Sequence, residues 1–160
     1  MLAQVSPPPR TMVDADALAR AVFAELVRLA DGFALAVVRS SRPREAHGAD
    51  AYYVRPQQGR PALIVVDDEL RPLPAARALA HELAHAILHA EADGVGEAQR
   101  EIEAELVAFA LLRSMGLDSL VESLDYVSQW ATCDDDVVNA QPRVEEACGA
   151  ILARRLPRAF

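Results

Sequence analysis

The sequence predicts an α+β fold in which a small three-stranded sheet accompanies several helices. Three observations support this class. The length of 160 residues suits one compact domain with a single core. Apolar residues recur at helical spacing in several long stretches, and three short β-type runs follow the first of these stretches. We therefore expect one domain over residues 13–160, preceded by a flexible proline-rich tail at residues 1–12.

Composition and charge exclude several classes of protein. The chain is 52% hydrophobic, which is typical of a globular protein. Its net charge is -8, so the chain lacks the excess of basic residues that direct nucleic-acid binding requires. No apolar run reaches the roughly 18 residues of a membrane span, and "MLAQVSPPPRTM" has prolines where a signal peptide would be apolar. Two cysteines are too few for a disulfide framework. We expect a cytoplasmic protein that does not contact membranes.

The first helix is expected over residues 14–32. Apolar residues recur there every three or four positions, Asp14 or Asp16 can cap the start, and Gly32 favours an end. Three strands follow, in "FALAVVRS", "DAYYVRP" and "ALIVVDD", with Gly59 and flanking prolines marking a turn between the last two. We expect these strands to form a sheet between the first helix and the later ones, with residues 62–67 at the edge of a substrate cleft, where an extended peptide can pair.

The next helix carries the histidines. After Pro72 and Pro74, the stretch "AARALAHELAHAILHAEAD" has helical spacing, with apolar residues on one side. The other side carries His81, His85 and His89, which are three of the four histidines in the chain. The fourth, His47, is interpreted as a loop residue.

Further helices are expected after this one. The stretch "EAQREIEAELVAFALLRSMG" ends at Gly116 and forms a second long helix. The remaining residues are consistent with two or three helices, with Ser119 and Glu122 as a candidate capping box and Pro142 at the start of the last helix.

The sub-string "HELAH" at residues 81–85 is the principal chemical motif. Histidines four residues apart project from one helix face, so His81 and His85 can both reach one zinc ion. Glu82 lies beside the open position of such a site, where it can act as the general base toward a bound water. An HExxH string also arises by chance on exposed helices. The gathering of histidines on one stripe, opposite an apolar face and followed by a glutamate-bearing helix, argues against chance here.

The sub-string "EIEAE" at residues 101–105 offers the third zinc ligand. Glu101 and Glu105 are four residues apart and share a helix face, whereas Glu103 lies on the opposite side and is expected to face solvent. Helix geometry leaves Glu101 and Glu105 as alternatives. Glu105 is slightly preferred because it is further from the helix start and has apolar neighbours.

These motifs resemble the ImmA/IrrE and ArdC-like zinc metallopeptidases. The resemblance rests on "HELAH", "HAILH" and "EAELVAFALL", while "GADAYYVRP", "ALIVVDD" and "SLDYVSQWA" are most similar to the ArdC-like peptidase domain of antirestriction proteins. It covers about residues 47–155 and implies a minimal zincin-like fold with Zn²⁺ as cofactor. The ligand glutamate of this family stands four residues before a phenylalanine, which selects Glu105, ahead of Phe109, in addition to His81 and His85.

The resemblance implies a zinc metallo-endopeptidase with Glu82 as catalytic base, acting on a protein substrate in a mobile-element, antirestriction or regulatory context. The competing hypothesis is a non-catalytic acidic interaction module with a structural zinc. His89 is expected to support the site by a hydrogen bond or to end the helix, with metal binding as the alternative. Tyr126 is interpreted as a packing residue beside Trp130, with hydrogen-bond donation to the reacting carbonyl as the alternative.

Overall fold

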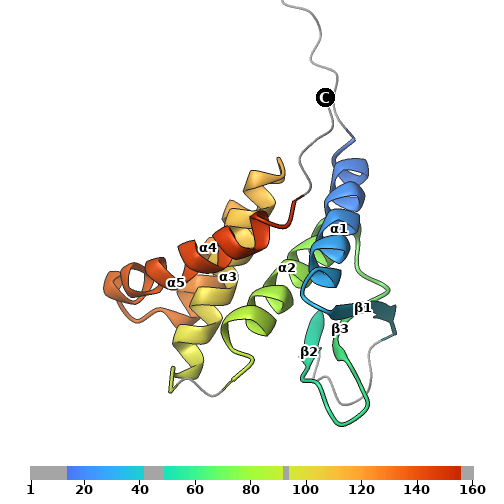
Figure 1. Ribbon diagram of the computed structural model, residues 1–160. Coiled ribbons are helices and arrows are strands. Elements are labelled where there is room, and N and C mark those ends of the chain that lie inside the picture. The colour runs from blue at the N-terminus through green and yellow to red at the C-terminus, as the bar shows by residue number, and fades with distance from the viewer. Residues whose placement is uncertain (1–13, 42–48, 92–93, 156–160) are drawn as a thin grey trace, which may run out of the picture.

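The computed structural model describes residues 14–41, 49–91 and 94–155. The predicted tail at residues 1–12 and His47 lie outside these ranges. The described residues form five helices and three strands (Figure 1). In chain order these are α1 (Ala15–Asp31), β1 (Leu35–Ser40), β2 (Ala51–Val54), β3 (Ala62–Asp67), α2 (Pro72–Leu88), α3 (Glu97–Ser114), α4 (Leu120–Trp130) and α5 (Asp134–Leu152). This confirms the α+β class with a small three-stranded sheet.

Helix α1 begins and ends as the sequence predicts. The Asp14 side chain accepts a hydrogen bond from the backbone N–H of Asp16 at 3.1 Å, and Gly32 follows the last turn. The helix buries Val22, Leu26 and Leu29. It packs directly on α2 and also contacts β1, so the sheet does not lie between the first helix and α2 as expected (Figure 1).

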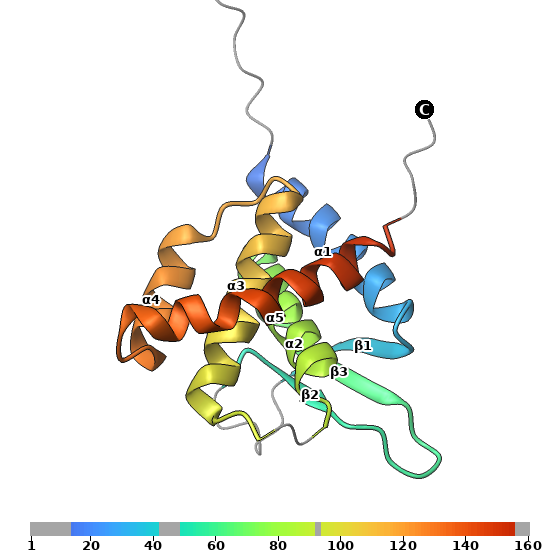
Figure 2. The ribbon, with the colours of Figure 1, turned by 60° about the vertical axis from the view of Figure 1, so that its left-hand side comes forward.

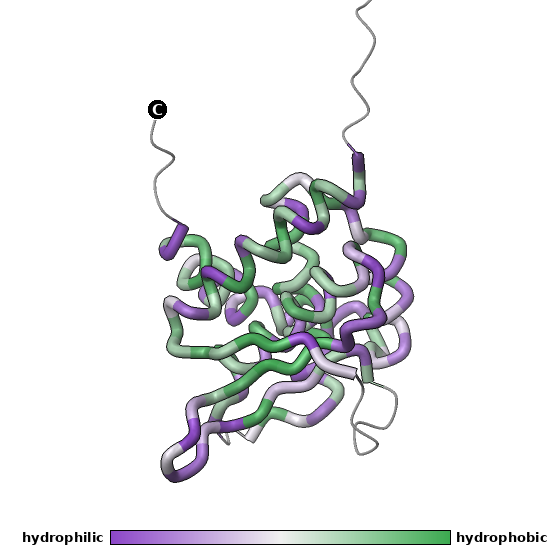
Figure 3. Tube along the Cα trace, turned by 90° about the vertical axis from the view of Figure 1, so that its right-hand side faces the viewer, coloured by the Kyte–Doolittle hydropathy of each residue, from purple (hydrophilic) through white to green (hydrophobic). Residues whose placement is uncertain are grey.

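The sheet has the strand order β1-β3-β2. Strand β3 pairs parallel to β1 and antiparallel to β2. The prediction that residues 62–67 form the cleft edge is therefore wrong, because β3 is the central strand and its backbone is paired on both sides. Its nearly continuous apolar run favours this place, with Ile64 and Val66 fully buried. Figure 3 shows the contrast between these apolar strands and the hydrophilic turn that joins β2 to β3.

Helix α2 is the centre of the molecule. It begins at Pro72, where a proline's missing N–H is tolerated, and it contacts α1, β2, β3, α3 and α5. Leu79 and Leu83 are fully buried on it. Helix α3 runs beside α2, and α5 crosses over both (Figure 2). The contact between α2 and α3 therefore brings the two predicted ligand helices together.

The C-terminal helices differ from the sequence prediction at two points. Ser119 precedes α4, but its hydroxyl faces Ser123 at 3.3 Å and does not cap the helix. Pro142 lies inside α5 and does not begin it. The helix starts earlier because the Asp136 carboxylate accepts the backbone N–H groups of Thr132, at 2.7 Å, and Cys133, at 3.2 Å.

Within the three described ranges, no helix combines the length and the hydropathy that crossing a bilayer requires.

Candidate metal centre

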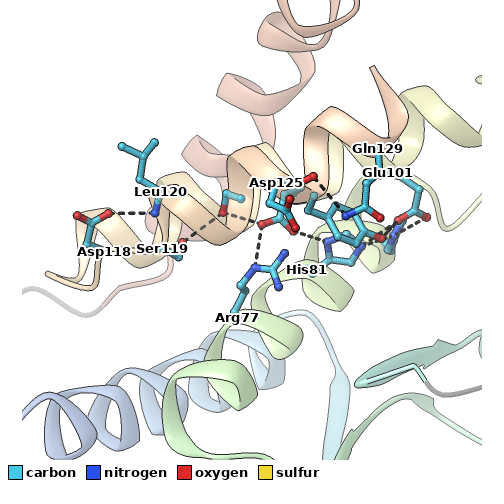
Figure 4. A network of polar contacts seen from close by, with 12 residues as sticks. Arg77, His81, Glu101, Asp118, Ser119, Leu120, Asp125 and Gln129 are labelled. Carbon is cyan, nitrogen blue, oxygen red and sulfur yellow. Dashed lines mark hydrogen bonds and ion pairs between the residues drawn. The ribbon is translucent and has the colours of Figure 1, made fainter. Parts of the chain in front are cut away.

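Helices α2 and α3 bring three metal-binding side chains together. Nε2 of His81 lies 3.0 Å from Nε2 of His85. The Glu101 carboxylate lies 3.2 Å from Nε2 of His81 and 3.3 Å from Nε2 of His85. The ligand atoms of the three residues all fall within 4.8 Å of one another. Figure 4 shows His81 and Glu101 meeting from their two helices. The structure thus unites the predicted His81 and His85 with one of the two alternative glutamates.

Glu105 occupies a different place. Its carboxylate lies 3.1 Å from Nδ1 of His81, the ring nitrogen that faces away from His85. It also accepts hydrogen bonds from Nε of Arg77 at 3.0 Å and from the Ser123 hydroxyl at 2.6 Å, and it is 1% exposed. The preference for Glu105 as the third ligand stays a prediction, and the structure places the other alternative, Glu101, beside the two histidines. The first turns of α3 face the histidine pair, so Glu101 lies beside it, and Glu105, one turn further on, reaches only the far side of His81.

Glu103 is buried, contrary to the prediction that it faces solvent. It is 1% exposed, because α5 covers the side of α3 that the sequence assigned to solvent. Its carboxylate lies 2.9 Å from Nε2 of His89 and 3.0 Å from Nε of Arg143. Nδ1 of His89 lies 3.0 Å from Nδ1 of His85. His89 also ends α2, so both roles expected for it are present in the structure.

Glu82 lies where two cavities meet. Cavities of about 470 Å³ and 580 Å³ are both lined by Glu82, His85 and Glu101. Burial raises the pKa of Glu82, against the opposing effects of His81 and His85 and of a hydrogen bond from the Tyr53 backbone. The predicted base therefore adjoins the candidate ligands at a solvent-connected site, and β2 helps to hold it.

Tyr126 lies at the candidate site, where its hydroxyl and its ring contact the candidate ligands. The alternative role, donation to a reacting carbonyl, stays a prediction. Its hydroxyl donates to the Glu101 carboxylate at 2.7 Å, and its ring meets His81 edge-to-face with centroids 5.3 Å apart. Trp130 lies further away, at 6.5 Å between ring centroids. Burial and the neighbouring Glu101 carboxylate raise the pKa of Tyr126, so its hydroxyl stays protonated. Tyr126 therefore both packs in the cleft and fixes Glu101.

The electrostatics of the site favour a charged cluster. Burial lowers the pKa of His81, but hydrogen bonds to Glu101 and Glu105 and the charge of Glu82 outweigh this effect and raise that pKa to about 9. Burial likewise raises the pKa of Glu101, yet hydrogen bonds from His81, His85 and Tyr126 lower it overall. In the metal-free site an ionised carboxylate thus lies beside a protonated His81, and a bound cation would have to displace that proton.

Two nitrogens and one oxygen form a donor set that suits zinc. Catalytic zinc sites have three protein ligands of these types and leave one position for water or substrate. When Nε2 of His81 binds a metal, its Nδ1–H donates to Glu105, which fixes both tautomer and ring orientation. Sequence reasoning missed the residues that pair with the two buried carboxylates. Arg77 and Ser123 donate to Glu105, and Arg143 pairs with Glu103. One signal was present, since Arg77 lies four residues before His81 and so shares its helix face.

Comparison with known proteins supports the assignment to a peptidase family. Residues 35–113 match a peptidase-family model described as the IrrE N-terminal-like domain. The matched segment runs from β1 nearly to the end of α3 and contains His81, Glu82, His85 and Glu101. Searches of curated proteins and of solved structures gave no match. The match supports the ImmA/IrrE part of the resemblance, and the narrower ArdC-like assignment stays a prediction.

Proposed function

We propose that this chain, similar over residues 35–113 to the IrrE N-terminal-like domain, is a zinc-dependent metallo-endopeptidase. The observation that carries the proposal is the convergence of His81, His85 and Glu101 in a cleft that Glu82 also lines. We assign the three converging residues as zinc ligands and Glu82 as the general base. Glu101 thereby replaces Glu105 in the ligand set expected from the sequence.

When bound by His81, His85 and Glu101, zinc would supply a Lewis acid and would lower the pKa of a coordinated water to roughly 7. Glu82 would serve as the general base and acid, accepting a proton at its carboxylate and giving it to the departing amine. Its buried carboxylate suits both transfers, because burial raises its pKa and so brings proton uptake closer to neutral pH. Tyr126 holds the Glu101 carboxylate in place through its hydrogen bond of 2.7 Å.

The shape of the cleft supports cleavage within a chain. The two cavities share Glu82, His85 and Glu101 and continue in different directions, one toward Trp130 and the other toward Tyr52 and Arg55. A peptide can therefore extend past the reacting bond on both sides. Strand β2, at the sheet edge beside Glu82, offers the pairing edge that the sequence prediction gave to residues 62–67.

The environment of His89 favours catalysis over a structural zinc. A structural site is closed by a fourth protein ligand. His89 is the histidine that the sequence suggests for this role, but its Nε2 bonds to Glu103 and its Nδ1 faces Nδ1 of His85. Among the described residues, the candidate cluster holds three ligands, so a fourth position would be open to water or substrate. This argues against the alternative of a non-catalytic acidic interaction module.

We further propose that the substrate is a protein and that the chain acts in the cytoplasm, in the mobile-element, antirestriction or regulatory context that the resemblance implies. The net charge of -8 supports a protein partner over direct contact with nucleic acid.

Two measurements test the proposed activity. Wild-type protein and Glu82→Gln are purified, their zinc content is measured, and both are incubated with a peptide library whose new termini are identified by mass spectrometry. We expect one zinc per chain in both proteins and chelator-sensitive cleavage by wild type alone. Glutamine is nearly isosteric with glutamate but cannot accept the proton, so only catalysis should be lost. A wild-type protein without zinc, or equal cleavage by both proteins, would contradict the proposal.

A further inference from the structure

A second buried polar group lies beyond the proposed ligands and base. Glu103 and His89 have side chains that are 2% and 3% exposed, and their Oε2 and Nε2 atoms are 2.9 Å apart. Arg143 of α5 makes an ion pair with Glu103 at 3.0 Å and donates to the Leu88 carbonyl at 3.1 Å. This group joins α5 to the end of α2 and reaches His85 through His89.

The direction of these hydrogen bonds follows from what each group can donate. An ionised carboxylate only accepts, so the Glu103 contact requires the proton on Nε2 of His89. Neutral His89 then presents a lone pair at Nδ1, 3.0 Å from Nδ1 of His85. That contact is favourable when His85 carries its proton on Nδ1, which leaves Nε2 of His85 free to bind a metal.

The two histidines on the metal site would then be supported in parallel. Glu105 contacts Nδ1 of His81 directly at 3.1 Å. Glu103 contacts His89, and His89 in turn contacts Nδ1 of His85, so His89 connects the second carboxylate to the second histidine. The three glutamates of "EIEAE" thus divide into one ligand and two supporting carboxylates, one for each histidine.

We infer that His89 and Glu103 form a positioning pair that holds His85 in its metal-binding tautomer and orientation. This inference rests on the proposed function, because it assigns His85 as a zinc ligand. The alternative is that the pair only stabilises the packing of α2, α3 and α5. The two possibilities differ in which nitrogen of His89 matters for zinc binding.

Two substitutions separate the nitrogens of His89. In asparagine the amide stands as many bonds from Cβ as Nδ1 does, so His89→Asn can still accept from His85 but does not reach Glu103. In glutamine the amide corresponds to Nε2, so His89→Gln can still donate to Glu103 but offers His85 no acceptor. His89→Ala removes both contacts and serves as the reference for complete loss.

Zinc affinity is measured for wild type and the three variants by competition with a chelator. Thermal melting of each metal-free protein reports stability, and the visible spectrum after cobalt substitution reports coordination geometry. We expect roughly 10–100-fold weaker zinc binding in His89→Gln and His89→Ala than in wild type. His89→Asn should bind zinc several-fold more tightly than His89→Gln and keep the cobalt spectrum of wild type. His89→Gln should nevertheless melt no lower than His89→Asn, because Glu103 keeps its partner.

Outcomes for the pair and for the proposed function are distinguishable. One outcome would show that the pair is only structural. In that outcome wild type binds zinc, and His89→Gln has both a higher zinc affinity and a higher melting temperature than His89→Asn. If all variants bind zinc like wild type, the positioning role is overturned while the metal site stands. A wild-type protein that binds no zinc would overturn the proposed function itself.

Discussion

Exchanging Glu101 and Glu105 separately for glutamine tests which of them binds zinc. Glu101 has carboxylate oxygens 3.2 Å from Nε2 of His81 and 3.3 Å from Nε2 of His85, whereas Glu105 contacts Nδ1 of His81 at 3.1 Å. We expect Glu101→Gln to lose a ligand and Glu105→Gln to lose only the support of a ligand. The two variants carry the same change in charge on the same helix, so each is the control for the other.

The expected magnitudes differ by at least an order of magnitude. Structural zinc in zinc-finger peptides binds with about 10–16 kcal/mol through four ligands, so one ligand contributes about 3–4 kcal/mol. Glutamine keeps a weak oxygen donor, so Glu101→Gln should weaken zinc binding by roughly 10²–10³-fold. Losing a supporting carboxylate costs about 10–100-fold, and glutamine still accepts from His81, so Glu105→Gln should lie near tenfold.

Stability of the metal-free protein should show a further effect of Glu105→Gln. The substitution removes the charge that pairs with Arg77 and accepts from Ser123, at a site that is 1% exposed. A lost hydrogen bond to a charged group costs about 1.5–3 kcal/mol. Because the Arg77 side chain is 23% exposed and can be hydrated, we expect the lower half of this range. That corresponds to a fall in Tm of about 3–9 °C.

Zinc affinity is measured by chelator competition at pH 7 and Tm by calorimetry on metal-free samples. Our assignment would be refuted if Glu105→Gln weakened zinc binding by 10²-fold or more while Glu101→Gln stayed within tenfold of wild type. That result would restore the ligand set expected from the sequence.

Two further predictions concern the core and the pH dependence of metal binding. Leu83→Ala should lower the free energy of unfolding by about 3 kcal/mol, because Leu83 is fully buried. The control Leu124→Ala, at a residue that is 61% exposed, should change this free energy by about 0.5 kcal/mol or less. Both are measured by urea unfolding. Zinc must displace the proton of His81, whose pKa is raised to about 9, so zinc affinity should increase by about tenfold per pH unit between pH 6 and 8. A pH-independent affinity over this range would contradict that protonation state.

Local sequence determined those features that depend on neighbours along the chain. The spacing of His81 and His85 puts both rings on one helix face in any packing, because residues four apart stack along a helix. The adjacent Glu82 follows from the same geometry. Helix α1 likewise has its cap at Asp14 and its end at Gly32, since these features need only local hydrogen bonds and turns. The three β-type runs form the strands because their residue types favour an extended backbone, although the pairing between strands is not local.

Tertiary packing decided what local spacing leaves open. Glu101 and Glu105 share a face of α3, and only the placement of α3 against α2 puts Glu101 beside the histidine pair. Glu103 was expected to be exposed because the polar side of an amphipathic helix usually faces solvent. Helix α5 covers that side and supplies Arg143, which compensates the buried charge.

The central position of β3 in the sheet was also decided by tertiary structure. Its apolar run favours a central place, and the pairing with β1 on one side and β2 on the other establishes it. Composition and periodicity thus determined most of the helices, the strands and two of the three proposed metal ligands. The proposed third ligand and its buried neighbours depend on the angle and contact between helices, which involve residues far apart in the sequence and leave no signature in local spacing.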